Sequence, residues 1–96
     1  MTLEDLYSII KKRKIILPKD SYVASLFRKG EDKILQKVGE EVTEVIVAAK
    51  GENKKRITEE VADLFFMTLV LLVEKGISIR SILDELEKRH RMLKRS

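Results

Sequence analysis

The sequence predicts an all-α protein, a bundle of four to five helices, and three observations support this fold class. Apolar residues recur at the spacing of amphipathic helices, and no segment shows the strict alternation of a strand. The single Pro and three of the four Gly fall between these periodic segments. Apolar residues make up 44% of the chain and charged residues 38%, which suits one helical core with a solvated surface. We therefore expect residues 1–96 to form a single small domain.

The first two helices are predicted from their start and stop signals. Thr2 is a plausible N-cap for a helix over about residues 3–13. The segment "ILPKD" ends that helix, because Pro18 disfavours helical backbone in the residue before it. Ser21 can then cap a short helix, "YVASLFRK", which stops at Gly30.

Three further helices follow from the same kind of signal. A long helix is expected over about residues 31–50, ending at Gly51. The next is expected over about 54–75, ending at Gly76. A final amphipathic helix begins after Ser78, which can serve as its N-cap.

The long helix has two distinct faces when its residues are placed at 100° per residue. We expect its apolar face to point into the core, and this face comprises Ile34, Leu35, Val38, Val42, Val45, Ile46 and Ala49. A separate face carries Lys33, Lys37, Glu40, Glu41 and Glu44. The acids on this face are close enough to repel one another, and lysines at helical-neighbour spacing could relieve the repulsion. For this helix alone, lysine pairing is the favoured interpretation.

The helix over 54–75 changes that interpretation. From Val61 to Val73 every residue is apolar except Asp63 and Thr68, which is typical of a helix surrounded by others. The other helices of one chain are too few and too short to cover this helix on every side. We therefore predict a homodimer with this helix in a shared helical core. A carboxylate inside such a stretch costs several kcal/mol to desolvate unless a charge meets it. For Asp63 that charge is either a metal ion or a buried Lys or Arg.

Two acid pairs at i, i+3 spacing are expected to face each other across the short connection "GENK". One pair is Glu41 with Glu44, and the other is Glu60 with Asp63. Four facing carboxylates would not all stay ionised without a cation, and oxygen-only ligands suit Mg²⁺ or Mn²⁺. The basic side chains of residues 28, 29, 33 and 37 would then face phosphate. These residues point to metal-dependent hydrolysis of a polyphosphate.

Composition excludes several other classes. The absence of cysteine rules out disulfides, thiolate zinc sites and thiol nucleophiles. The N-terminus lacks the pattern of a signal peptide, and the apolar stretch is too short to span a bilayer, so we expect a cytoplasmic protein without membrane contact. Basic clusters such as "KKRK" at 11–14 leave nucleic acid as a conceivable partner. Solvated helix faces explain them better, and we expect no nucleic acid partner.

At this point the motifs become recognisable. "EEVTE" followed by "EEVAD" resembles the EExxE…ExxD signature of the all-α nucleoside triphosphate pyrophosphohydrolases. Within that superfamily, "SYVASLFRKGEDKILQKVGEEVTEVIVAAKG" and "EEVADLFFMTLVLLVEKGISIRSILDELEKR" look like the phosphoribosyl-ATP pyrophosphohydrolase family, over about residues 3 to 90. The resemblance implies Mg²⁺-dependent hydrolysis of phosphoribosyl-ATP to phosphoribosyl-AMP and pyrophosphate, the second step of histidine biosynthesis, in a homodimer.

The resemblance also implies roles for individual residues. The metal ligands, and hence the catalytic residues, would be Glu41, Glu44, Glu60 and Asp63. The substrate-side residues would be Ser21, Ser25, Gly30, Lys33, Lys37 and Glu40. In many organisms this domain is fused to the cyclohydrolase that acts next. No such domain is present here, so we expect a stand-alone enzyme with a separate cyclohydrolase.

Two other functions compete with this interpretation. The same fold and metal could serve a house-cleaning pyrophosphohydrolase of another nucleoside triphosphate such as dUTP, although "SYVASLFRKG" matches the histidine-pathway branch. The chain could instead be a non-enzymatic basic helical module, whose binding would depend on salt but not on metal.

Overall fold

The computed structural model describes residues 1–95, and these form helices joined by short connections, with no strand among them. The helices are α1 (Leu3–Ile16), α2 (Tyr22–Lys29), α3 (Glu31–Gly51), α4 (Lys54–Lys75) and α5 (Ile79–Arg95). This confirms the predicted all-α fold class.

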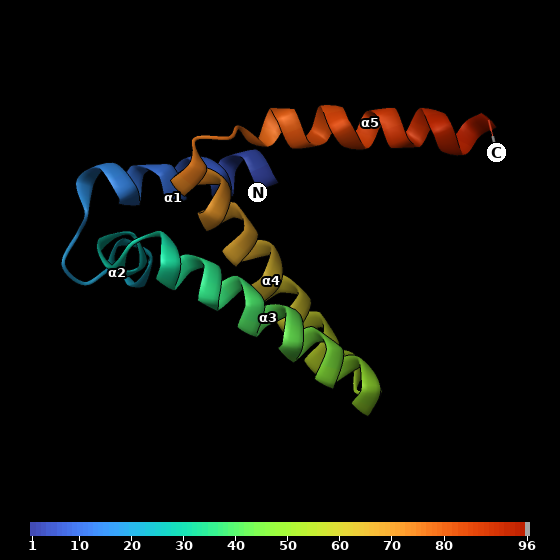
Figure 1. Cartoon of the computed structure of the whole chain (residues 1–96), viewed down its shortest axis with the longest axis horizontal. Helices are drawn as coiled ribbons and strands as arrows, with labels where there is room; N and C mark the ends of the chain where they lie inside the picture. Colours follow the sequence, from blue (N-terminus) through green and yellow to red (C-terminus); the bar gives the residue numbers. More distant parts are fainter. Residues whose placement is uncertain (96) are drawn as a thin grey trace.

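An antiparallel hairpin of α3 and α4 forms the body of the protein (Figure 1). Helices α1 and α2 pack at the end of the hairpin where α3 begins and α4 ends. Helix α5 leaves that same end and extends away from the hairpin, so the chain spans 48 × 33 × 26 Å. A wide angle therefore separates α5 from the free end of the hairpin.

The predicted N-caps are confirmed by hydrogen bonds. Thr2 and Asp5 form a reciprocal capping box at α1, with both bonds at 3.0 Å. The Ser21 hydroxyl accepts from the Ala24 amide at 3.1 Å, and the Ser78 hydroxyl accepts from the Ser81 amide at 3.2 Å. These local signals work because each satisfies backbone donors that the first helical turn leaves free.

The predicted ends of two helices were wrong. Helix α1 continues to Ile16 rather than residue 13, because Pro18 restricts only Leu17, which takes a left-handed conformation (φ 54°, ψ 57°) and ends the helix. Helix α3 includes Gly51, and Glu52 adopts the left-handed cap at φ 61°.

The core lies where α1 and α2 meet the hairpin. Its fully buried large side chains are Ile10, Leu26, Ile34 and Val70, one from each of the first four helices. The expectation that the whole apolar face of α3 is buried was wrong for a single chain. Only Ile34 of that set is buried; Val38 and Val45 are half-buried, and Leu35, Val42, Ile46 and Ala49 are exposed. Helix α4 covers only part of the α3 face, and the described chain offers nothing else to cover the rest.

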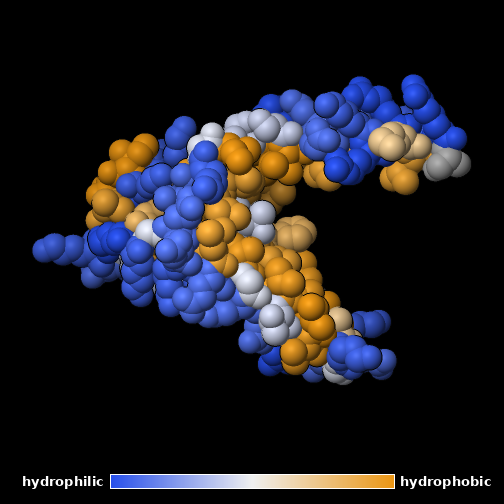
Figure 2. Space-filling view, viewed as in Figure 1, coloured by the Kyte–Doolittle hydropathy of each residue, from blue (hydrophilic) through white to orange (hydrophobic). Residues whose placement is uncertain are grey.

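Helix α4 is likewise uncovered on one side. Phe65 is 56% exposed, and Ala62, Asp63 and Thr68 are exposed as well. Figure 2 shows hydrophobic side chains along the hairpin and on the side of α5 that faces it. As expected from the small number of helices, one chain does not surround α4 on every side. None of the described helices is long and apolar enough to cross a membrane.

Candidate metal and substrate site

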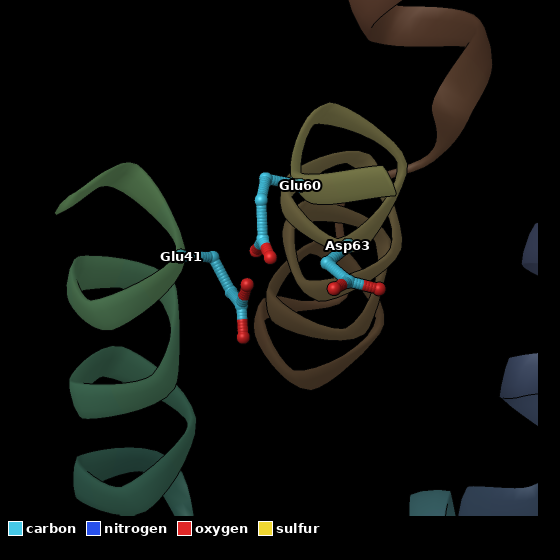
Figure 3. Close-up of side chains that lie close together, drawn as sticks. All are labelled: Glu41, Glu60 and Asp63. Carbon is cyan, nitrogen blue, oxygen red and sulfur yellow. The ribbon is translucent and has the colours of Figure 1, made fainter. Parts of the chain in front are cut away.

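Three carboxylates converge between α3 and α4 (Figure 3). Glu41 comes from α3, and Glu60 and Asp63 come from α4. Each offers one oxygen, and these three oxygens lie within 4.8 Å of one another. We call these three residues the acid cluster. The sequence predicted this convergence, because both α4 acids share one helix face and a short connection turns that face toward α3.

The connection between the two helices sets their register. The Asn53 side chain accepts a hydrogen bond from the Arg56 amide at 3.1 Å and so caps α4. In the first turns of α4, the Arg56 guanidinium lies 3.6 Å from Glu60 and 3.9 Å from Glu44. Arg56, on α4, is thus the basic side chain that pairs with both Glu44 and Glu60.

Glu41 is the member of the acid cluster that most needs a cation. Its Oε2 atom is buried and has no hydrogen-bond partner among the described residues. Burial raises the pKa of this carboxyl above its usual range, and the neighbouring Asp63 and Glu60 raise it further, while Lys37 acts in the opposite direction. A buried, unpaired carboxylate oxygen beside two other acids is costly without a positive charge.

Asp63 does not have the environment that its apolar neighbours predicted. Its side chain is exposed in the single chain, so the expected desolvation of this residue does not occur there. Within residues 1–95 no basic side chain forms an ion pair with Asp63, which also contradicts the alternative of a buried Lys or Arg partner. Asp63 instead lies beside two other carboxylates, those of Glu41 and Glu60.

Glu44 lies outside the acid cluster. It is one turn beyond Glu41 on α3, its side chain is 52% exposed, and it pairs with Arg56. The structure thus brings together three of the four predicted ligands and leaves the fourth beside them.

Three of the predicted substrate-side residues, Ser21, Ser25 and Gly30, lie in α2 or at its ends. Ser21 caps α2, and the Ser25 hydroxyl donates to the carbonyl of Tyr22, so both serines have structural hydrogen bonds. Gly30 joins α2 to α3 at φ 97°, a backbone angle that disfavours any residue with a Cβ. Gly30 is the single residue between α2 and α3, so the first turn of α3 follows α2 directly.

The predicted basic residues divide into two groups. Lys37 lies on α3 one turn before Glu41 and pairs with Glu40 at 3.4 Å. Lys33 is half-buried on the same helix. The Arg28 guanidinium instead donates to the carbonyls of Leu17 and Pro18 at 2.7 and 2.8 Å. Arg28 therefore fastens the loop between α1 and α2, and its expected role toward phosphate is not supported.

Sequence reasoning missed Tyr22. This residue lines a hollow of about 200 Å³ together with Glu41, Asp63, Phe66 and Met67. The signal was available, because Tyr22 is a large aromatic residue that does not belong to the buried face of α2, formed by Ala24 and Leu26. It is 58% exposed at the border of the acid cluster.

Comparisons with known proteins agree on one family. Residues 3–90 match the family model described as phosphoribosyl-ATP pyrophosphohydrolase. A phosphoribosyl-ATP pyrophosphatase of Leptospira biflexa is 57% identical over 94% of this chain and 95% of its own length. One from Lactiplantibacillus plantarum is 56% identical over 91% of this chain and 82% of its own. A histidine biosynthesis bifunctional protein of Caldanaerobacter subterraneus is 52% identical over 93% of this chain and 43% of its own.

Proposed function

This chain belongs to the phosphoribosyl-ATP pyrophosphohydrolase family, and we propose that it performs the family's reaction at a Mg²⁺ site formed by the acid cluster. The reaction is hydrolysis of phosphoribosyl-ATP to phosphoribosyl-AMP and pyrophosphate, in histidine biosynthesis. The observation that carries the metal proposal is the convergence of Glu41, Glu60 and Asp63 around a buried, unpaired oxygen of Glu41.

The donor set suits Mg²⁺. Carboxylate oxygens are hard ligands, and Mg²⁺ in proteins usually combines one or two carboxylates with waters and substrate phosphates. When bound, the ion polarises a phosphoanhydride and lowers the pKa of a bound water, which is the chemistry that this hydrolysis needs. A cation would also satisfy the orphaned Oε2 of Glu41 and offset the repulsion that raises the pKa of its carboxyl group.

Different residues of the chain bind the cation and the phosphate groups in this proposal. Glu41 on α3 and the two acids on α4 hold the cation between the helices. Lys37 lies one turn before Glu41 and keeps its proton. Tyr22 raises the pKa of the Lys37 ammonium group, and the hydrogen bond from Lys37 to Glu40 raises it as well. Lys37 therefore offers a fixed positive charge to a phosphate group. The substrate-side set that we propose is Ser21, Ser25, Gly30, Lys33, Lys37 and Glu40.

We include Glu44 in the proposed ligand and catalytic set, together with Glu41, Glu60 and Asp63. Glu44 lies one helical turn after Glu41 on the same side of α3. Its partner in the free chain is Arg56, at 3.9 Å across an exposed ion pair. Exposed pairs of this kind contribute little to stability, about 0–1 kcal/mol, so a divalent cation can compete for Glu44.

The proposed enzyme is a homodimer, as the uncovered apolar surface suggests. A hollow of about 410 Å³ lies between α5 and the hairpin, and it is lined almost entirely by apolar side chains. Phe65 at 56% exposure and Ile46 at 58% exposure lie on the hairpin, and the open side of the hairpin in Figure 2 is hydrophobic. Large apolar patches of this kind typically mark protein interfaces, and a second copy of the chain fits the predicted shared helical core.

We further propose that residues 1–96 act as a single cytoplasmic domain and that the following cyclohydrolase is a separate protein. In support, the Leptospira biflexa protein, covered over 95% of its length, is named for the pyrophosphatase alone.

The test is direct incubation of the protein with phosphoribosyl-ATP and Mg²⁺, with release of pyrophosphate as the readout. Release should be lost with EDTA and restored by excess Mg²⁺. ATP and dUTP serve as competing substrates, and faster turnover of dUTP would assign the chain to the house-cleaning function instead. No turnover of any nucleotide by a folded, Mg²⁺-loaded protein would refute the proposal.

A further inference from the structure

Tyr22 is the first residue of α2, and the helix holds it firmly at the border of the acid cluster. The Ser21 cap fixes the start of the helix. Ala24 and Leu26, at 0% and 1% exposure, anchor its inner side in the core. The Tyr22 side chain itself is 58% exposed and lines a hollow that it shares with Glu41 and Asp63. An anchored backbone with an open side chain is a suitable arrangement for contact with a ligand.

The two tyrosines of the chain differ in what their hydroxyl groups do. The Tyr7 hydroxyl donates to the carbonyl of Ile77 at 2.8 Å and so ties α1 to the connection between α4 and α5. The Tyr22 hydroxyl makes no hydrogen bond within residues 1–95. It is therefore an uncommitted donor at the hollow next to two members of the acid cluster.

The electrostatic surroundings of Tyr22 suit an anion that arrives with a cation. Tyr22 raises the pKa of the Lys37 ammonium group, and Lys37 lies on α3 one turn before Glu41. The carboxylates of Glu41 and Asp63 line the same hollow as Tyr22, and they repel a bare anion and attract a cation. A phosphate chain bridging a cation at the acid cluster and the Lys37 ammonium would pass the phenol group.

We propose that Tyr22 is a substrate-contacting residue that donates its hydroxyl hydrogen bond to a phosphate oxygen of the phosphoanhydride chain, beside Lys37. This inference rests on the proposed function, since it requires a cation-bound phosphate chain at the acid cluster. A neutral donor is useful at this place, because it binds phosphate without a positive charge that would compete with Mg²⁺ for the carboxylates. Tyr22 thus contributes to recognition of the phosphate chain, while the acid cluster holds the metal.

The experiment compares Tyr22→Phe with Tyr7→Phe, the same loss of one hydroxyl group at a site remote from the acid cluster. Three quantities are measured on the full chain: kcat and KM for phosphoribosyl-ATP, binding of Mg²⁺ alone, and binding of inorganic pyrophosphate in the presence of Mg²⁺. A hydrogen bond to a charged group predicts that Tyr22→Phe lowers kcat/KM and weakens pyrophosphate binding by roughly tenfold to a hundredfold. Mg²⁺ binding should stay within about twofold, and Tyr7→Phe should leave all three nearly unchanged.

Two results would overturn the inference. If Tyr22→Phe binds pyrophosphate and turns over substrate like the wild type, the hydroxyl contacts no phosphate. If Mg²⁺ binding falls together with pyrophosphate binding, Tyr22 supports the metal site instead. If the wild type does not hydrolyse phosphoribosyl-ATP, the proposed function fails, and the pyrophosphate comparison still decides the role of Tyr22.

Discussion

Replacing Glu41 with Gln tests the metal site through stability as well as activity. The substitution keeps the shape of the side chain and removes one negative charge from a group of three carboxylates within 4.8 Å of one another. In the metal-free protein the charge is unfavourable, because Oε2 is buried and has no partner among the described residues. Glu41→Gln should therefore stabilise the metal-free protein and weaken its response to Mg²⁺.

The expected size follows from the geometry. Two unit charges at the 4.8 Å limit repel by about 0.9 kcal/mol in bulk water and about 3.5 kcal/mol at an effective dielectric constant of 20. Asp63 is exposed and Arg56 partly neutralises Glu60, so solvent and counter-charge screen both repulsions. We expect a gain of about 1 kcal/mol in the free energy of unfolding, or about 4–8 °C in Tm for a domain of this size.

The pH dependence has a definite sign. The folded state raises the pKa of Glu41 above its ordinary value of 4.5, so it binds more protons than the unfolded state above that pH. Metal-free wild type should therefore lose stability as the pH rises from about 4.5 through the raised pKa of Glu41. Glu41→Gln removes this titration, and its stability should be flatter over the same range.

The assay is denaturant unfolding of both proteins at one protein concentration, with EDTA and with saturating Mg²⁺. A ligand at 100 times its Kd stabilises the folded state by about 2.7 kcal/mol, and the wild type should gain stability of this order. Glu41→Gln should gain much less. The control is Glu59→Gln, the same substitution at an exposed position on α4 outside the acid cluster. A variant that is less stable without metal, or stabilised by Mg²⁺ as much as the wild type, would refute this reasoning.

Three further predictions concern catalysis, assembly and substrate binding. Asp63→Asn should lower kcat/KM for pyrophosphate release by roughly a hundredfold or more, since even an outer-shell partner of a metal is worth about 10–100-fold; full activity in the folded variant would exclude a ligand role. Phe65→Glu should convert the proposed dimer into folded monomers of 11.1 kDa, measured by light scattering, because the Phe65 side chain is 56% exposed in one chain. Ile15→Glu, at a 73% exposed site on α1, should leave the assembly unchanged. Lys37→Ala should lower kcat/KM for phosphoribosyl-ATP by about tenfold, the value of one charged phosphate contact, with little change in Mg²⁺ affinity; an unchanged kcat/KM would remove Lys37 from the substrate site.

Local signals in the sequence were sufficient to predict most of the fold. N-caps such as Thr2 and Ser21 act through hydrogen bonds within one turn, so the residue type alone identifies them. Helix ends were less predictable, because an ending depends on which residue takes the left-handed backbone. Leu17 and Glu52 do so here, although neither is a glycine.

The pattern of one chain predicted which residues need cover, but not which of them are covered within the chain. The apolar residues around Asp63 predicted a helix that one chain is too small to cover on every side, and Phe65 and Thr68 are exposed in the single chain. The pattern is consistent with residues that are covered only after assembly, and periodicity alone does not distinguish burial within a chain from burial between chains. The uncovered face of α4 is thus part of the support for a homodimer.

The acid cluster shows where sequence reasoning about the site succeeds and where it stops. Glu41 meets Glu60 and Asp63 because helical spacing fixes each face and the short connection fixes how the faces meet. Glu44 is spaced i, i+3 from Glu41, as Asp63 is from Glu60, but Glu44 pairs with Arg56. Helical spacing fixes the face on which a side chain lies, but it does not fix which neighbour a long exposed side chain contacts. Arg56 carries one positive charge and shares it between Glu44 and Glu60. The proposed divalent cation would carry twice that charge, and it would also meet the buried oxygen of Glu41, with which Arg56 forms no ion pair among the described residues. Arg56 therefore balances only part of the negative charge that the proposed Mg²⁺ would neutralise.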